Sequence, residues 1–237
     1  MHPVTIRPAI RERVLARRGR VHLFDRLDPA RTALAVIDMQ GTFCAEGGPA
    51  EVPLSRAIVP AINRLTAGLR PLRVPVIWVL HANARRDSGS DWDLFFDHFV
   101  HGDVRARTIE SLAPGRQSVW SDLAIGPADL TVLKNRYSAM LPGASDLEAV
   151  LAKRGVDTLL LAGTKTNVCV ESTARDAMMR GFKVVVVEDC CAALSDDEHR
   201  AALETVIQQF GDVMTGDEAL ARLAPQPGLS AGSGGVP

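Results

Sequence analysis

Short apolar runs alternate with longer amphipathic stretches along most of this chain, and few folds are compatible with that pattern. Apolar runs of strand length lie at residues 33–37, 74–80, 130–133, 158–162 and 183–187, with a weaker sixth run near residues 212–214. Helix-length stretches lie at residues 55–69, 146–154, 172–181 and 196–210, and glycines of the kind that end helices stand at positions 155, 181 and 211. Strands that alternate with helices build a parallel sheet covered by helices on both faces. The sequence therefore predicts an α/β fold of this kind.

The middle of the chain has the organisation of one domain. With 237 residues, of which 46% are hydrophobic, the chain can bury a sizeable core. Residues 30–222 contain no repeat and no linker, so we expect one domain there. Residues 1–29 are polar and predict an N-terminal arm, whereas the Pro-, Gly- and Ser-rich residues 223–237 predict a disordered tail. Residues 83–128 are the least regular, and we expect them to cover a pocket or to contact a neighbouring subunit.

Charge and cysteine usage limit the partners of the chain. The formal net charge is −1, so no basic field draws nucleic acid or an anionic membrane, and the apolar runs are too short to span a bilayer. The N-terminus has no apolar signal segment, so we expect a cytoplasmic protein. The expected partners are a small molecule and further copies of the chain, in a homo-oligomer that is either a dimer or a tetramer. Cys44, Cys169, Cys190 and Cys191 form no C-x-x-C pair, which predicts free thiols and no zinc site.

Six arginines cluster near the N-terminus, at positions 7, 11, 13, 17, 18 and 20. The simplest interpretation is a solvated arm or helix face. A contact with another subunit is the alternative.

Cys169 lies at the turn between an apolar run, residues 158–162, and a helix-like stretch that begins at Ser172. Backbone N–H groups and the helix dipole both stabilise negative charge at such a turn. These conditions lower the pKa of a thiol and make it a nucleophile, and they also supply donors for an oxyanion. We therefore predict that Cys169 is a catalytic nucleophile, with a small buried cysteine as the alternative.

Two more polar residues end predicted strands on the same edge of the sheet. Asp38 follows the first strand and Lys134 ends the third, and parallel strands place their carboxyl ends together. Asp38, with its pKa raised by burial, can take the thiol proton of Cys169 and return it to a leaving amine. Lys134 would hold Asp38 in place. Taken singly, the aspartate could instead be a turn or cap residue and the lysine a surface residue.

The segments around these residues resemble the isochorismatase-like cysteine hydrolases. The likeness spans residues 30–215 and is carried by AVIDMQ at 35–40 with Phe43 and the glycines at 47 and 48, KNRYSA at 134–139, GTKTNVCVESTARDA at 163–177, and the acidic pair at 188–189. The cysteine-centred block is the most specific of these. It looks like the ureidoacrylate and N-carbamoylsarcosine amidohydrolase branch of the family.

This resemblance implies a fold, a catalytic triad and a chemistry. The implied fold is a six-stranded, mainly parallel, three-layer Rossmann-like sheet, and the implied triad is Asp38, Lys134 and Cys169. The peptide bond before Lys165 would be cis, with the N–H groups of Lys165 and Cys169 forming the oxyanion hole. Members of the family hydrolyse small amides and ureides such as nicotinamide, ureidoacrylate and biuret. A branch that cleaves isochorismate lacks the cysteine, so Cys169 favours hydrolysis of a C–N bond through a thioester-type acyl-enzyme.

The resemblance also bears on metals and on the pocket. Nicotinamidases carry an Asp-x-His metal site after the first motif, whereas residues 48–54 here contain no histidine and His81 would lack a partner. We therefore expect no metal and no cofactor. Residues 83–101 are expected to close the pocket. The expected substrate-binding side chains are Phe43, Arg85, Trp92, Phe96, Tyr137 and Asn167.

Besides an amidohydrolase that acts on a small linear amide or ureide, three other functions stay open. One is a hydrolase of a cyclic or peptide-like amide on the same scaffold. Another is a catalytically silent binding protein. The third is a redox-sensing thiol protein that pairs Cys169 with Cys44, which requires the two sulfurs to lie close together.

Overall fold

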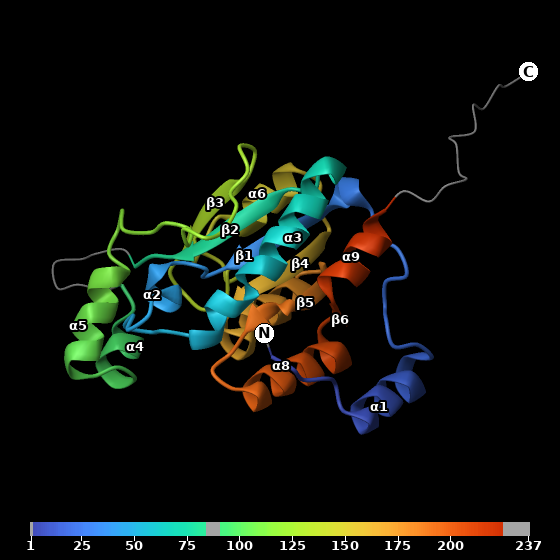
Figure 1. The fold of residues 1–237 in the computed structure, drawn as a ribbon, viewed down its shortest axis with the longest axis horizontal. Helices are drawn as coiled ribbons and strands as arrows, with labels where there is room; N and C mark the ends of the chain where they lie inside the picture. The colour runs from blue at the N-terminus through green and yellow to red at the C-terminus, as the bar shows by residue number, and fades with distance from the viewer. Residues whose placement is uncertain (1, 84–90, 225–237) are drawn as a thin grey trace, which may run out of the picture.

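The computed structural model describes residues 2–83 and 91–224, and in these residues six parallel strands form one sheet. The strand order is β3-β2-β1-β4-β5-β6 (Figure 1). The strands are β1 (Thr32–Ile37), β2 (Val76–His81), β3 (Leu130–Lys134), β4 (Thr158–Thr164), β5 (Lys183–Ala192) and β6 (Asp212–Met214). The chain runs outward from β1 to β3 and then from β4 to β6, so its direction reverses between β1 and β4. A reversal of this kind opens a crevice at the carboxyl edge of the sheet.

Helices cover both faces of the sheet, so the predicted fold class is confirmed. One face carries α1 (Pro8–Arg18), α6 (Leu147–Lys153), α7 (Glu171–Met179) and α8 (Asp196–Gln209). The other face carries α3 (Val59–Leu69) and α9 (Gly216–Leu223), which lie side by side (Figure 1). Strand β1 shows how the two faces are filled: Ala35 and Ile37 join the first apolar cluster, whereas Leu34 and Val36 join the second. Burial on both faces explains why the strands are continuous apolar runs in the sequence.

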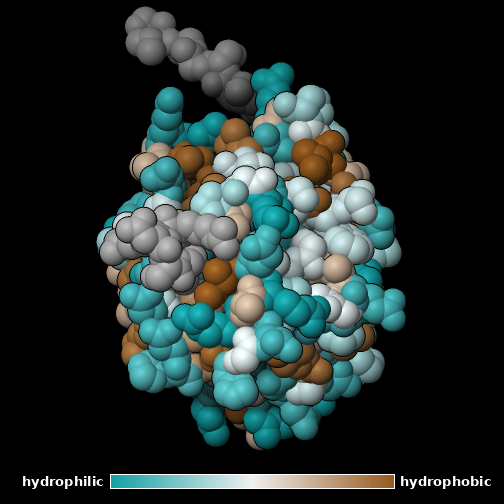
Figure 2. Space-filling model, turned by 90° about the vertical axis from the view of Figure 1, so that its left-hand side faces the viewer, coloured by the Kyte–Doolittle hydropathy of each residue, from teal (hydrophilic) through white to brown (hydrophobic). Residues whose placement is uncertain are grey.

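Shorter helices gather at one end of the sheet. These are α2 (Gly41–Cys44), α4 (Asp93–His98) and α5 (Gly102–Ser111), at the left of Figure 1. Figure 2 looks onto this end, where hydrophobic residues are interspersed with hydrophilic ones. The stretch 83–128 therefore contains two helices, and residues 84–90 within it lie outside the described part of the chain.

Several element boundaries differ from the sequence prediction for local reasons. The stretch 55–69 begins as a 3₁₀ turn, Pro53–Ile58, and the α-helix starts only at Val59, because Pro60 is tolerated only in a first helical turn. Strand β5 continues past its predicted end at Val187, since residues 191 and 192 pair with β4 beyond a register shift. The sequence prediction ended the strand at Val187 because the next two residues, 188 and 189, are acidic.

Gly211 follows α8 in the position that the sequence suggested, but its φ is not left-handed and a close contact also requires glycine there. Gly155 and Gly181 adopt left-handed φ values of 66° and 91° after their helices, as predicted. At Gly211, by contrast, a Cβ atom would lie 2.4 Å from the carbonyl oxygen of Val184. This glycine is needed for the close approach of the chain to β5.

The N-terminal segment is tied to the domain by its arginines. Arg7 binds the buried carboxylate of Glu204, with its Nε 2.9 Å from Oε1. Arg17 and Arg18 each donate to a backbone carbonyl near the end of α8, at 3.0 Å. The arginine cluster is thus more than a solvated face, because it fastens α1 to α8.

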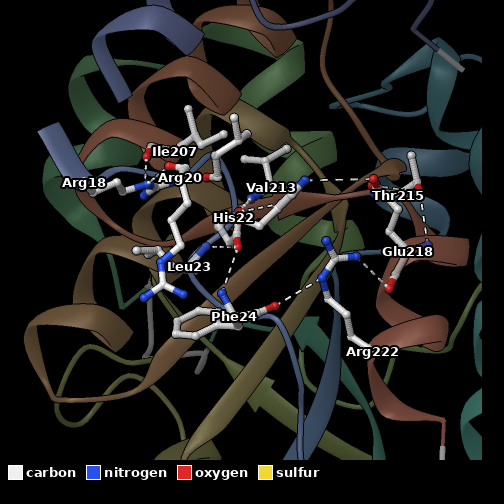
Figure 3. A network of polar contacts seen from close by, with 12 residues as sticks. Arg18, Arg20, His22, Leu23, Phe24, Ile207, Val213, Thr215, Glu218 and Arg222 are labelled. Atoms are coloured by element: carbon white, nitrogen blue, oxygen red, sulfur yellow. Dashed lines mark hydrogen bonds and ion pairs between the residues drawn. The ribbon is translucent and has the colours of Figure 1, made fainter. Parts of the chain in front are cut away.

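The chain after α1 is held by the first residue of β6. The buried carboxylate of Asp212 accepts hydrogen bonds from the N–H groups of Leu23 (2.6 Å) and Phe24 (3.3 Å). Arg222 of α9 donates to the Phe24 carbonyl oxygen at 3.1 Å (Figure 3). Residues 22–24 therefore add polar contacts along the β6 edge. None of the helices in the described ranges is long and apolar enough to cross a membrane.

Candidate active site

The predicted site residues lie at the carboxyl ends of β1, β3 and β4. Asp38 follows β1 with a φ of 56°, a left-handed conformation that aspartate tolerates better than most residues, and its N–H donates to the Val79 carbonyl oxygen at 2.8 Å. Gly163 in β4 approaches β1 so closely that a Cβ atom there would lie 2.1 Å from the carbonyl oxygen of Ile37. Glycine at this position lets the end of β4 lie directly beside Asp38.

Asp38 and Lys134 form a buried ion pair. Lys134 Nζ lies 2.9 Å from Asp38 Oδ2, and the two side chains are 0% and 1% exposed. The ammonium group also donates to the Arg136 carbonyl oxygen at 3.1 Å. Burial raises the pKa of Asp38 above its ordinary value of 3.8, and the charge of Lys134 opposes that rise. The pKa of Lys134 is raised as well, because the attraction of Asp38 and Cys169 outweighs the effect of burial on the ammonium.

Cys169 lies in a π-helical turn, η4 (Thr166–Val170), that joins β4 to α7. The predicted position at a strand-to-helix turn is therefore correct, but the predicted lowering of its pKa is wrong. The thiol is almost fully buried, and burial together with the negative charge of Asp38 raises its pKa to about 12. Lys134 opposes this shift without cancelling it. The resting group is therefore a thiol, so nucleophilic attack requires a base.

A small cavity of about 90 Å³ lies against these residues. Its wall is made of Asp38, Phe43, Ala50, His81, Trp92, Phe95, Phe96, Thr108, Leu112, Tyr137, Lys165, Val168 and Cys169. Trp92 holds the wall together: its ring centroid lies 4.8 Å from those of Phe95 and Tyr137. Burial and the neighbouring Cys169 raise the pKa of Tyr137 to about 12, so its hydroxyl keeps its proton.

The other expected site residues fall in several places. Phe43, Trp92, Phe96 and Tyr137 line the cavity. Asn167 does not, although its side-chain oxygen is buried without a hydrogen-bond partner among the described residues. Arg85 lies outside the described residues. The role of each in substrate binding stays a prediction.

The backbone before Cys169 has the conformation that the resemblance implied. The Thr164–Lys165 peptide bond is cis, and both Lys165 and Cys169 line the cavity.

His81, the last residue of β2, lines the cavity, which sequence reasoning did not predict. It was considered only as a possible metal ligand. In the sheet it pairs in register with Lys134, and its Nδ1 lies 3.2 Å from Lys134 Nζ. Its position at a strand end on the same edge as Asp38 and Lys134 was the available signal. Within residues 2–83 and 91–224, no group of three or more His, Cys, Asp or Glu side chains is arranged to hold a metal ion.

The fold and the site define a class of protein: a three-layer α/β domain with a cavity lined by Asp38 and Cys169 at the carboxyl edge of its sheet. The model of the isochorismatase domain matches residues 32–218, and the chain belongs to this family of hydrolases. The resemblance seen in the sequence is thereby confirmed.

Named relatives and a solved structure agree with this membership. The chain is 29% identical to maleamate amidohydrolase of Pseudomonas putida over 81% of this chain and 87% of that protein. It is 30% identical to ureidoacrylate amidohydrolase of Methylobacterium radiotolerans over 82% and 81%. The crystal structure of a cysteine hydrolase from Pseudomonas syringae pv. phaseolicola is similar with a TM-score of 0.73 and 33% identity, covering 83% of this chain and 94% of that one.

Proposed function

We propose that the chain is a cysteine amidohydrolase that cleaves the C–N bond of a small amide or ureide. The observation that carries the proposal is the buried ion pair of Asp38 and Lys134 beside Cys169, with Asp38 and Cys169 open to one cavity. The names of two relatives, maleamate and ureidoacrylate amidohydrolase, support the same bond type. A thiol, a carboxylate and an ammonium group are sufficient for acyl transfer through a covalent intermediate.

In the first step Cys169 attacks the substrate carbonyl carbon. Its thiol is protonated at rest, because its pKa is raised to about 12. Asp38 takes the proton as the sulfur–carbon bond forms, and Lys134 keeps the carboxylate ionised until then. The side chain of Cys169 acts on Asp38 as a hydrogen-bond partner, so the thiol and its proposed base are neighbours.

The tetrahedral intermediate then collapses and releases an amine. The proposed oxyanion donors are the N–H groups of Lys165 and Cys169. Protonated Asp38 gives its proton to the departing nitrogen as the C–N bond breaks, which leaves a thioester on Cys169. Water then attacks the thioester while Asp38 takes one proton from it. The acid product leaves, and the sulfur regains its proton from Asp38.

The cavity supports a small, flat substrate. Its volume of about 90 Å³ lies below the roughly 300–1,000 Å³ of typical ligand pockets, which favours a small substrate. The rings of Phe43, Trp92 and Phe96 form apolar walls, which suit a planar amide or ureido group. A ureidoacrylate-like or N-carbamoyl substrate is the form that we propose.

A panel of amides and ureides with ammonia detection tests this function. Wild-type protein should release ammonia from at least one member, and Cys169→Ala should reduce that turnover by orders of magnitude while the circular dichroism spectrum stays the same. Cys190→Ala is the matched control, because Cys190 is fully buried in the opposite apolar cluster. Near-full activity of Cys169→Ala would contradict the proposal.

The same panel separates the remaining alternatives. Cyclic and peptide-like amides in the panel test the other substrate class, and activity on none of the compounds would favour a silent binding protein. The redox alternative has less support, since Cys44 and Cys169 belong to apolar clusters on opposite faces of the sheet and all four cysteines are free.

A further inference from the structure

The imidazole of His81 carries an unused polar atom at the cavity. The residue is 4% exposed and lines the cavity wall. Its Nδ1 contacts Lys134 Nζ at 3.2 Å, whereas its Nε2 has no hydrogen-bond partner among the described residues. Buried polar atoms are almost always hydrogen-bonded, and exceptions gather where a ligand completes the set.

The contact with Lys134 settles which nitrogen of His81 holds the proton. An ammonium group has only donors, so Nδ1 of His81 must accept the hydrogen bond with its lone pair. The one proton of the neutral ring is therefore on Nε2, which makes Nε2–H a donor. A second proton is disfavoured, because burial and the charges of Lys134 and Arg136 hold the pKa of His81 well below its ordinary value of 6.5.

The backbone of His81 is anchored, and two aromatic rings flank its imidazole. The side chain of Gln40 donates to the His81 carbonyl oxygen at 3.0 Å and accepts from the His81 N–H at 2.7 Å. Trp92 stacks against the imidazole at a centroid distance of 6.3 Å, and the ring of Phe43 is tilted by 50° to the imidazole at 6.5 Å. A donor supported in this way needs little reorganisation to bind a ligand.

A second unsatisfied group lies next to the imidazole. Asn83 is 1% exposed, and neither its side-chain oxygen nor its nitrogen has a hydrogen-bond partner in the described structure. Its amide acts as a side-chain hydrogen-bond partner of the imidazole and raises the pKa of His81, although no pair of atoms of the two side chains reaches regular hydrogen-bond geometry. Asn83 therefore lies beside the imidazole without giving its Nε2 a hydrogen bond of regular geometry.

We propose that Nε2–H of His81 is a specificity-determining donor that binds a second oxygen of the substrate, apart from the carbonyl that Cys169 attacks. This inference rests on the amidohydrolase activity proposed above. That oxygen accepts the hydrogen bond with a lone pair, and it belongs either to a carboxylate or to a second carbonyl. Amides without such an oxygen leave the donor buried and unpaired, and the enzyme discriminates against them for that reason.

Three amides with the same four-carbon backbone test the inference. Succinamate carries a carboxylate as its second oxygen group, succinamide carries a neutral carbonyl, and butyramide carries neither. The variant His81→Phe keeps an aromatic ring at this position but lacks the N–H donor. The kcat/KM ratio of succinamate or of succinamide to butyramide should fall by about tenfold to a hundredfold, mainly through KM. The compound whose ratio falls identifies the type of oxygen.

Two further variants separate specificity from structural damage. His81→Gln can accept from Lys134 and still donate into the cavity, so it should restore most of the ratio. His98→Phe removes an exposed histidine on α4 and should leave the ratio unchanged. If His81→Phe changed both ratios by less than about twofold, or lowered kcat equally for all three amides, the assignment would be wrong.

A binding experiment decides the inference without turnover. Calorimetry on Cys169→Ala should show that succinamate or succinamide binds more tightly than butyramide, and that adding His81→Phe removes the difference. If no amide is hydrolysed, the proposed activity fails while this measurement still stands. Nitrogen NMR of the histidine side chains should show His81 as the neutral Nε2–H tautomer, and a proton on Nδ1 would overturn the argument.

Discussion

Removing Lys134 should leave a buried carboxylate without its cation, and the cost can be worked out from the site. In Lys134→Met, Asp38 stays buried but loses the ion pair at 2.9 Å. Its carboxyl group should then become protonated in the folded state, whereas in the unfolded chain it keeps a pKa near 3.8. Holding it protonated at pH 7 costs about 4 kcal/mol, because pH 7 lies about three pH units above that pKa. This value agrees with the loss of stability of about 3–5 kcal/mol that is typical when one partner of a buried ion pair is removed.

The free energy of unfolding of Lys134→Met should also change with pH in a defined direction. Because the pKa of Asp38 in folded Lys134→Met lies above its unfolded value, the folded state binds more protons. The free energy of unfolding should therefore fall by about 1.4 kcal/mol per pH unit from about pH 4 up to the folded pKa, and it should recover as the pH is lowered.

Urea unfolding at pH 5 and pH 7 measures the effect. The control is the double variant Asp38→Asn/Lys134→Met, which has no carboxyl group to titrate. The stability difference between the double variant and Lys134→Met should grow by about 2.7 kcal/mol between the two pH values. Equal pH dependence of the two proteins would refute the view that Lys134 is what keeps Asp38 ionised.

Three further predictions concern activity. The value of kcat/KM should fall as the pH drops through the raised pKa of Asp38, so the acid limb should lie above pH 3.8, and a limb at or below that value would contradict the burial argument. Asp38→Asn should lose about as much activity as Cys169→Ala, and the double variant should be no worse, because the two residues act as one unit. Exhaustive chelation should leave ammonia release unchanged; loss that zinc or iron reverses would reveal a metal site.

Much of the fold and part of the site followed from local sequence pattern. The alternation of apolar and amphipathic stretches predicts a parallel sheet because each stretch must bury its apolar side, and this requirement holds wherever the elements finally pack. The strand ends at Asp38, Lys134 and the turn before Cys169 could be placed on one edge because parallel strands end together. The role of residues 83–101 was less predictable, since aromatic residues in an irregular segment can pack against many partners.

The tertiary structure alone decided how these groups act on one another. The pKa of Cys169 is raised rather than lowered, because burial and the charge of Asp38 come from segments far away in the chain. The contact between His81 and Lys134 depends on the register of β2 against β3, which the sequence does not specify. Periodicity and motifs report what each segment prefers, whereas the desolvation and charge that set its chemistry exist only once distant segments are packed together.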